Sequence, residues 1–146
     1  MSGITNPTEP YFKDGVWGWD GTVWRKLPLV WGFSDTYGES ADDMNVAAGD
    51  RFKNYGPVPA GEVWVVTFFQ VTPVQANITR LQLGANVGGV SCALLETGTI
   101  VADESIGVSG QIILAKDDYL FYYYAGALVN DDFYSSAVGY KMKIAE

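Results

Sequence analysis

The chain has 146 residues, of which 14% are aromatic, 18% are charged and 17 are glycines, a composition that predicts a single all-β domain with many turns. Its 17 acidic and 9 basic side chains give a formal net charge of -8, which argues against nucleic acid as a partner because phosphate contacts need a basic surface. It has no histidine and one cysteine, Cys92, so Ser-His-Asp catalysis, His-ligated zinc or iron and an intrachain disulfide are excluded.

No apolar run is long enough to span a membrane, and the N-terminus lacks the basic and then apolar pattern of a signal peptide. We therefore expect a soluble protein that has no membrane partner and is not exported by the Sec route. The missing catalytic groups also disfavour an enzyme. We predict no catalytic activity and no cofactor.

The N-terminal third of the chain divides into an arm and a meander. Residues 1–10 contain two prolines and no apolar periodicity, which predicts an extended N-terminal arm. The next segment, 11–33, predicts a small Trp-rich β-meander because Asp14-Gly15 and Asp20-Gly21 favour tight turns between short strands. The strands of this meander are expected at residues 11–13, 16–19 and 23–26.

Four of the five tryptophans lie in this meander. Large aromatic rings bury much area at low entropic cost, so they suit a small local core, a docking surface for another protein or a platform on which sugars stack. The sequence leaves these three interpretations open. The four residues are Trp17, Trp19, Trp24 and Trp31.

Residues 57–72 form the segment around which the rest of the chain is organised. A Pro/Gly turn leads into a run of β-branched and aromatic residues, which predicts a strand. Both faces of this strand are apolar over most of its length, so we expect each face to be covered by another layer. One face is expected to carry Val63, Val65, Thr67, Phe69 and Val71, and the other Trp64, Val66, Phe68 and Gln70.

Short strands then recur at intervals set by turns, which is typical of a sandwich or barrel. We predict a jelly-roll-like β-sandwich of about eight strands over residues 57–146, joined to the meander by an irregular connector at 34–56. In the last strand, alternation places Val138, Tyr140, Met142 and Ile144 inward. The strands after the first are expected near residues 77–83, 87–96, 99–102, 110–115, 118–126 and 133–145.

The strand at 118–126 is unusually rich in tyrosine. Its alternation places Leu120, Tyr122 and Tyr124 on one face and Tyr119, Phe121 and Tyr123 on the other. An outward tyrosine face suits a subunit interface, where the ring is buried and the hydroxyl finds a partner. The alternative is an ordinary central strand, and the sequence does not decide between the two.

Acidic residues cluster in the predicted turns. If the strands run up and down, two of these turns lie at the same end of the sandwich, and their four carboxylates become a candidate Ca²⁺ site or a candidate pair of glycosidase carboxylates. No alternating Asp-x-Asp-x-Asp loop supports calcium, and solvated turns commonly contain Asp. The four residues are Asp103, Glu104, Asp131 and Asp132.

Two short motifs resemble proteins of tailed bacteriophages. Residues 19–26, WDGTVWRK, resemble hairpins near the start of tail-fibre and other virion proteins, and residues 58–64, VPAGEVW, resemble the entry into β-sandwich domains of phage structural proteins. The resemblance implies a head decoration protein or a neck or tail accessory subunit, often trimeric and anchored through an N-terminal arm. The chain lacks the repetitive shaft of tail fibres, which favours a compact subunit.

The leading hypothesis is therefore a non-enzymatic virion structural protein, made in the host cytoplasm, whose partners are other virion proteins and copies of itself. The alternative is a carbohydrate- or receptor-binding module of a phage tail, in which the four meander tryptophans bind a host surface glycan. The residues expected to make assembly contacts are Ile4, Pro7, Pro10, Tyr11, Phe12, Trp17, Trp19, Tyr122 and Tyr124.

Overall fold

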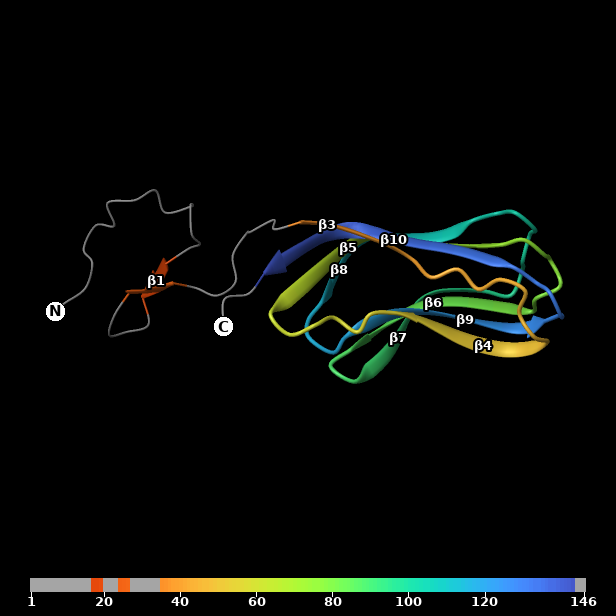
Figure 1. The fold of residues 1–146 in the computed structure, drawn as a ribbon, viewed down its shortest axis with the longest axis horizontal. Helices are drawn as coiled ribbons and strands as arrows, with labels where there is room; N and C mark the ends of the chain where they lie inside the picture. Colours follow the sequence, from red (N-terminus) through yellow and green to blue (C-terminus); the bar gives the residue numbers. More distant parts are fainter. Residues whose placement is uncertain (1–16, 20–23, 27–34, 144–146) are drawn as a thin grey trace.

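The computed structural model describes residues 17–19, 24–26 and 35–143, which form ten β-strands. Two antiparallel four-stranded sheets lie face to face and enclose one core (Figure 1). No helix long and apolar enough to cross a bilayer occurs in this part of the chain. The strands are β1 (Trp17–Trp19), β2 (Trp24–Lys26), β3 (Asp35–Ser40), β4 (Gly49–Tyr55), β5 (Glu62–Pro73), β6 (Arg80–Val87), β7 (Val90–Thr97), β8 (Ile106–Leu114), β9 (Tyr119–Ala127) and β10 (Phe133–Lys143).

The strand order is that of a jelly roll, so the expected all-β sandwich is confirmed. One sheet has the order β3-β10-β5-β8 and the other has the order β4-β9-β6-β7. Only β6 and β7 form a hairpin within one sheet, and every other connection from β3 to β10 crosses to the opposite sheet. Strands distant in sequence therefore become neighbours, as in the β3–β10 pair at one edge.

The core is unusually aromatic and is held together by ring pairs that span the two sheets. Tyr124 of β9 stacks on Phe133 of β10 with centroids 3.9 Å apart, and Tyr55 of β4 meets the edge of Phe69 of β5 at 5.3 Å. Each such pair contributes about 0.5–1.5 kcal/mol beyond the area that it buries. Leu81 and Leu83 of β6 belong to the same core and are fully buried.

A β-bulge changes which residues of β5 face the core. Thr67 is an extra residue opposite β10, since Val66 pairs with Gly139 and Phe68 pairs with Val138. On the other side of β5, where Val66 pairs with Ile112 and Phe68 with Ser109, Thr67 faces two residues of β8. The inward positions are therefore Trp64 and Val66 before the bulge, and Phe69 and Val71 after it. The uniform alternation expected for this strand is wrong because one inserted residue reverses the parity of everything that follows.

The expected orientation of β10 is also wrong. Phe133, Ser135 and Ala137 are the buried positions, whereas Val138 is 44% exposed. The side chains of β10 alternate in the opposite sense to the prediction, because Phe133, at the start of the strand, places its aromatic ring in the core. Ile144, which was also expected inward, lies outside the described residues.

The segment predicted to be an irregular connector instead supplies two strands of the sandwich. β3 and β4 are edge strands, and Tyr37 and Tyr55 are their buried residues. Polar residues occupy most other positions, which hides the alternation and protects an exposed edge from unwanted pairing. The strand expected at 99–102 is absent, and those four residues lie in the loop between β7 and β8.

The described strands before Asp35 form a separate pair. β1 pairs antiparallel with β2, in the register Trp19 to Trp24, and neither joins a four-stranded sheet. These strands match two of the three expected in the meander. The third, at 11–13, and the arm at 1–10 lie outside the described residues.

Candidate functional site

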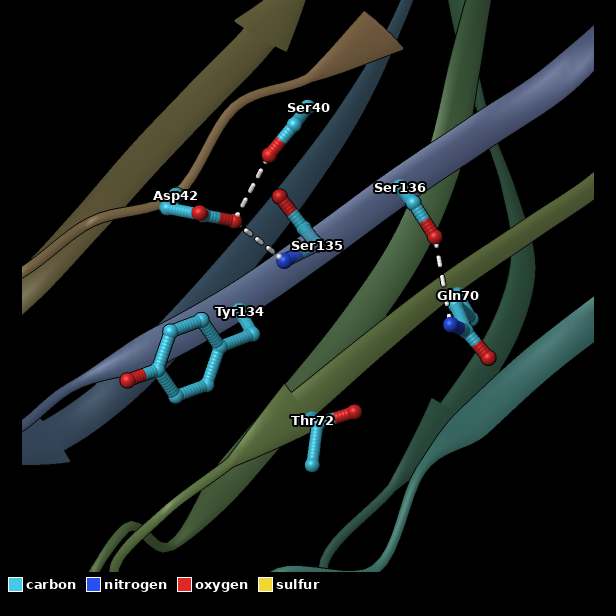
Figure 2. Close-up of a pocket in the computed structure, with 7 residues that line it drawn as sticks. All are labelled: Ser40, Asp42, Gln70, Thr72, Tyr134, Ser135 and Ser136. Atoms are coloured by element: carbon cyan, nitrogen blue, oxygen red, sulfur yellow. Dashed lines mark hydrogen bonds between the residues drawn. The ribbon is translucent and has the colours of Figure 1, made fainter. Parts of the chain in front are cut away.

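A shallow polar depression lies on the outer face of the β3-β10-β5-β8 sheet and has a volume of about 240 Å³. The register places its residues side by side: Ser136 of β10 lies opposite Ser40 of β3 and Gln70 of β5, and Tyr134 lies opposite Thr72. These residues share one face because each pair is directly opposed across antiparallel strands. Figure 2 shows the seven lining residues, Ser40, Asp42, Gln70, Thr72, Tyr134, Ser135 and Ser136.

Hydrogen bonds hold the side chains around the depression in place. The Gln70 amide nitrogen donates to the Ser136 hydroxyl at 3.1 Å (Figure 2). One oxygen of Asp42, Oδ1, accepts from the Ser40 hydroxyl at 2.9 Å and from the Ser135 backbone N–H at 2.8 Å. The depression is therefore built from two preoriented polar pairs rather than from freely rotating side chains.

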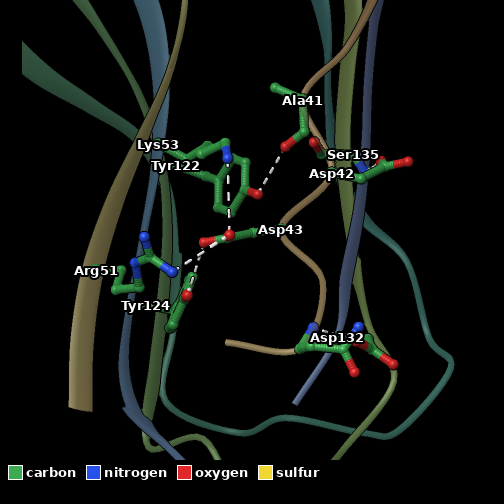
Figure 3. A network of polar contacts seen from close by, with 10 residues as sticks. Ala41, Asp42, Asp43, Arg51, Lys53, Tyr122, Tyr124, Asp132 and Ser135 are labelled. Atoms are coloured by element: carbon green, nitrogen blue, oxygen red, sulfur yellow. Dashed lines mark hydrogen bonds and ion pairs between the residues drawn. The ribbon is translucent and has the colours of Figure 1, made fainter. Parts of the chain in front are cut away.

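Next to the depression, the segment after β3 enters the core and connects the two sheets. Asp43 is buried at 6% exposure and accepts a 2.8 Å hydrogen bond from the Tyr124 hydroxyl (Figure 3). The side chains of Arg51 and Lys53 approach the other Asp43 oxygen at 3.5 and 3.6 Å. A buried carboxylate needs such partners, since an unpaired charge in the core is costly.

The core tyrosines are held in their protonated form. Burial is the main cause that raises the pKa of Tyr55 to about 12 and keeps the pKa values of Tyr122 and Tyr124 well above their usual range. The Tyr122 hydroxyl donates to the Ala41 carbonyl at 2.8 Å. The hydroxyls of Tyr122 and Tyr124 act as hydrogen-bond donors that position the segment after β3, rather than as acids or bases.

The structure corrects the assembly role expected for two tyrosines. Tyr122 and Tyr124 are fully buried inside the sandwich, so in the folded domain they cannot contact a neighbouring subunit. β9 is a central strand, and its outward face carries Phe121 and Tyr123 instead. Phe52 stacks on Phe121 at 4.6 Å, and Arg80 covers the Tyr123 ring at 5.6 Å.

The four candidate calcium ligands do not form a metal site. Within the described part of the chain, no group of three or more acidic or cysteine residues is placed to hold an ion. Asp131 accepts hydrogen bonds from the Leu128 N–H and the Asn77 amide, and Asp132 accepts one from the Asn45 N–H. These carboxylates stabilise the loop before β10. Asp103 and Glu104 lie on the exposed turn before β8.

For the remaining predicted site residues, the structure describes either no atoms or the backbone alone. Ile4, Pro7, Pro10, Tyr11, Phe12 and Trp31 are not among the described residues, and only the backbone is described at Trp17, Trp19 and Trp24. Their proposed contacts stay predictions.

The depression itself was not anticipated from the sequence. One signal was available: Gln70 and Thr72 interrupt an otherwise apolar strand, and polar residues at alternate positions mark an outward face. Their partners Tyr134 and Ser136 lie more than sixty residues away, and only the pairing of β5 with β10 brings the two sets together.

No protein-family model matches the chain, and no curated protein matches it in sequence.

Proposed function

We propose that the chain is a non-enzymatic structural protein of a tailed-bacteriophage particle, a head decoration protein or a neck or tail accessory subunit. The observation that carries the proposal is the distribution of tryptophan. Four of the five tryptophans precede Asp35, whereas every strand of the two four-stranded sheets lies at or after Asp35 and the described core uses Trp64 alone. Tryptophan is enriched at protein interfaces, so a Trp-rich segment that supplies no described strand to the sandwich suits attachment to another protein.

Two further features support a particle component. The WDGTVWRK and VPAGEVW motifs lie in the order found in phage structural proteins, the first in the N-terminal segment and the second at the entry to β5. The jelly roll is also an architecture of viral capsid proteins. That likeness is an analogy at the level of the fold, which hosts other functions as well.

An uncharged edge strand supports association with copies of the same chain. β8 is an edge strand of the β3-β10-β5-β8 sheet, and in the described residues it pairs only with β5. Its sequence, IGVSGQIIL, has no charged residue and no proline, whereas the other three edge strands each carry at least one charge. Open edges of this kind are normally protected or covered. A chain with net charge -8 repels its copies least where it carries no charge.

The test combines truncation with particle assembly. A variant lacking residues 1–12 keeps every described strand, so circular dichroism should show an unchanged β-sheet spectrum. We expect it to be lost from particles made by a phage that carries the truncated gene, while the full chain co-sediments with them. Normal incorporation of the truncated chain would refute anchoring through the arm.

Oligomeric state provides a second measurement. Mass photometry of the full chain should give a homo-oligomer, a trimer on the pattern implied by the resemblance. A strict monomer that also fails to co-sediment with particles would contradict the structural role.

The alternative function is host attachment through carbohydrate or receptor binding by a phage tail module. One observation favours it, and it lies on the sandwich rather than among the tryptophans: the polar depression on the outer face of the β3-β10-β5-β8 sheet.

A further inference from the structure

The depression presents polar groups of the kinds that bind sugar hydroxyls. Its lining combines one carboxylate, one amide and several hydroxyls, which together offer both donors and acceptors. A sugar hydroxyl donates and accepts at the same oxygen, so a site for it needs both kinds of partner at short spacing. Ser40, Ser136 and Gln70 provide this in one row across three neighbouring strands.

Several of these groups keep unused bonding capacity. In the described part of the chain, Asp42 Oδ2, the Gln70 side-chain oxygen and the Tyr134 hydroxyl have no hydrogen-bond partner, although Asp42 and Gln70 are each held by a bond through another atom. A ligand that bonds to the unused atoms therefore has little side-chain motion left to freeze. Preorganisation of this kind favours binding because it lowers the entropic cost.

The surface beside the polar row is apolar and aromatic. On β10 the outward positions run Tyr134, Ser136 and Val138, and Phe68 lies opposite Val138 on β5. Tyr134 is 49% exposed and Phe68 is 37% exposed, so part of each ring remains open to solvent. A pyranose ring has an apolar C–H face and a polar rim. The rings of Tyr134 and Phe68 suit the apolar face, and the Ser136 hydroxyl between them suits the polar rim.

The charge of the protein and the volume of the depression restrict which class of sugar can bind. The Asp42 carboxylate and the net charge of -8 disfavour sialylated, uronic or sulfated sugars. The volume of about 240 Å³ lies below the roughly 300–1,000 Å³ of pockets for drug-sized ligands, so the site accommodates a single sugar unit. Asp42 is the only carboxylate in the lining, whereas glycoside hydrolysis needs a pair, so the arrangement suits binding rather than cleavage.

We propose that this depression, centred on Gln70, Tyr134 and Ser136, binds one neutral hexose or N-acetylhexosamine unit of a glycan. The site is distinct from the tryptophans of the N-terminal segment. The sugar site also does not depend on the virion role. The protein could be a particle subunit that binds no sugar, or it could bind sugar without being part of a particle.

The experiment uses the full chain on an array of immobilised glycans that carry terminal glucose, galactose, mannose or N-acetylhexosamine, with sialylated and sulfated glycans alongside. The monosaccharide at the tip of the strongest binder is then titrated into the protein and followed by amide NMR shifts. We expect binding to neutral glycans only, and the largest shifts at residues of β5 and β10 around the depression.

Variants locate the site. Tyr134→Ala and Gln70→Ala should each weaken binding by about tenfold, the loss expected when a stacking or hydrogen-bonding anchor is removed. Gln111→Ala is the matched control, because Gln111 is an exposed glutamine on β8 outside the depression, and its affinity should equal that of the unmodified chain. Circular dichroism confirms that each variant is folded.

Three results would overturn the proposal. The first is the absence of binding to every neutral glycan on the array. The second is selective binding of the sialylated or sulfated glycans. The third is unchanged affinity in folded Tyr134→Ala and Gln70→Ala, which would place any sugar site elsewhere. None of these results bears on the truncation experiment, so the two proposals fail separately.

Discussion

The hydroxyl of Tyr124 donates a 2.8 Å hydrogen bond to the buried carboxylate of Asp43, and this bond ties the two sheets together. Tyr124 lies on β9 in one sheet. The backbone of Asp43 forms hydrogen bonds in both directions with Phe133 of β10, in the other sheet. The Tyr124 ring also stacks on Phe133, so polar and apolar contacts between the same strands reinforce each other.

Removal of this hydroxyl should destabilise the fold. Tyr124→Phe keeps the ring stacking but leaves a buried carboxylate oxygen without its donor, and we expect a loss of about 1–3 kcal/mol in the free energy of unfolding. Urea denaturation measures the loss. Tyr134→Phe is the control, because Tyr134 is half-exposed and its hydroxyl has no partner in the described chain, and its change should stay within about 0.5 kcal/mol. Equal losses in the two variants would contradict the structural role of the Asp43 bond.

The β-bulge at Thr67 depends on a glycine in the opposite strand. A Cβ atom on Gly139 would collide with the Val65 carbonyl oxygen, whereas one on Gly38, in the neighbouring strand, would meet nothing within 4 Å. Gly139→Ala should therefore cost about 3 kcal/mol or more, because backbone of the central strand must move. Gly38→Ala should be close to neutral or slightly stabilising. Thermal unfolding of the pair tests this, and similar melting temperatures would show that β5 and β10 do not approach so closely.

The buried tyrosines predict a loss of stability at alkaline pH. Burial is the main cause that raises the pKa values of Tyr37, Tyr55, Tyr122 and Tyr124 above the ordinary value of about 10. In the unfolded chain these hydroxyls ionise near pH 10, whereas in the folded chain they stay protonated to higher pH. Their contribution is therefore complete below about pH 10 and falls above it, by up to about 1.4 kcal/mol per pH unit for each tyrosine.

Urea denaturation between about pH 8 and about pH 11.5 measures this dependence. Tyr55→Phe should make the alkaline slope shallower, since one of the contributing groups is then missing. A free energy of unfolding that stays constant from about pH 10 upward would show that the tyrosines ionise equally in both states.

A charge beside the open edge should weaken self-association. Ile113 lies on β8 and is 59% exposed, so Ile113→Lys is expected to leave the fold intact while it places like charges at the proposed contact between copies. We expect about tenfold weaker association by sedimentation equilibrium. Val129→Lys is the matched control, because Val129 is 66% exposed in the loop before β10. The same association constant for both variants would exclude β8 as the contact.

The fold class followed from local sequence alone. Runs of β-branched and aromatic residues, separated by Gly, Asn and Asp turns, predict strands whatever their partners, and β5 to β9 appear within a few residues of the expected places, apart from the four-residue strand at 99–102. The edge strands β3 and β4 were missed because a strand with one buried face position and charged neighbours has no visible alternation. Their pairing energy comes from β10 and β9, which lie far along the chain.

The candidate site depended still more on tertiary structure. Leu120 marks the core face of β9, and it places Tyr122 and Tyr124 inside the sandwich only once a second sheet is known to cover that face. Thr67 shifts the parity of β5, an effect that appears only when strands are paired.

The sequence by itself determined that this chain is an all-β sandwich without histidine chemistry, preceded by a Trp-rich segment, because composition and turn residues act locally. Only the tertiary structure decided which side chains meet. Gln70 lies beside Ser136, and Tyr124 beside Asp43, because register and crossover connections join strands across more than sixty residues. No local pattern encodes such contacts. They arise from the packing of two sheets around one core.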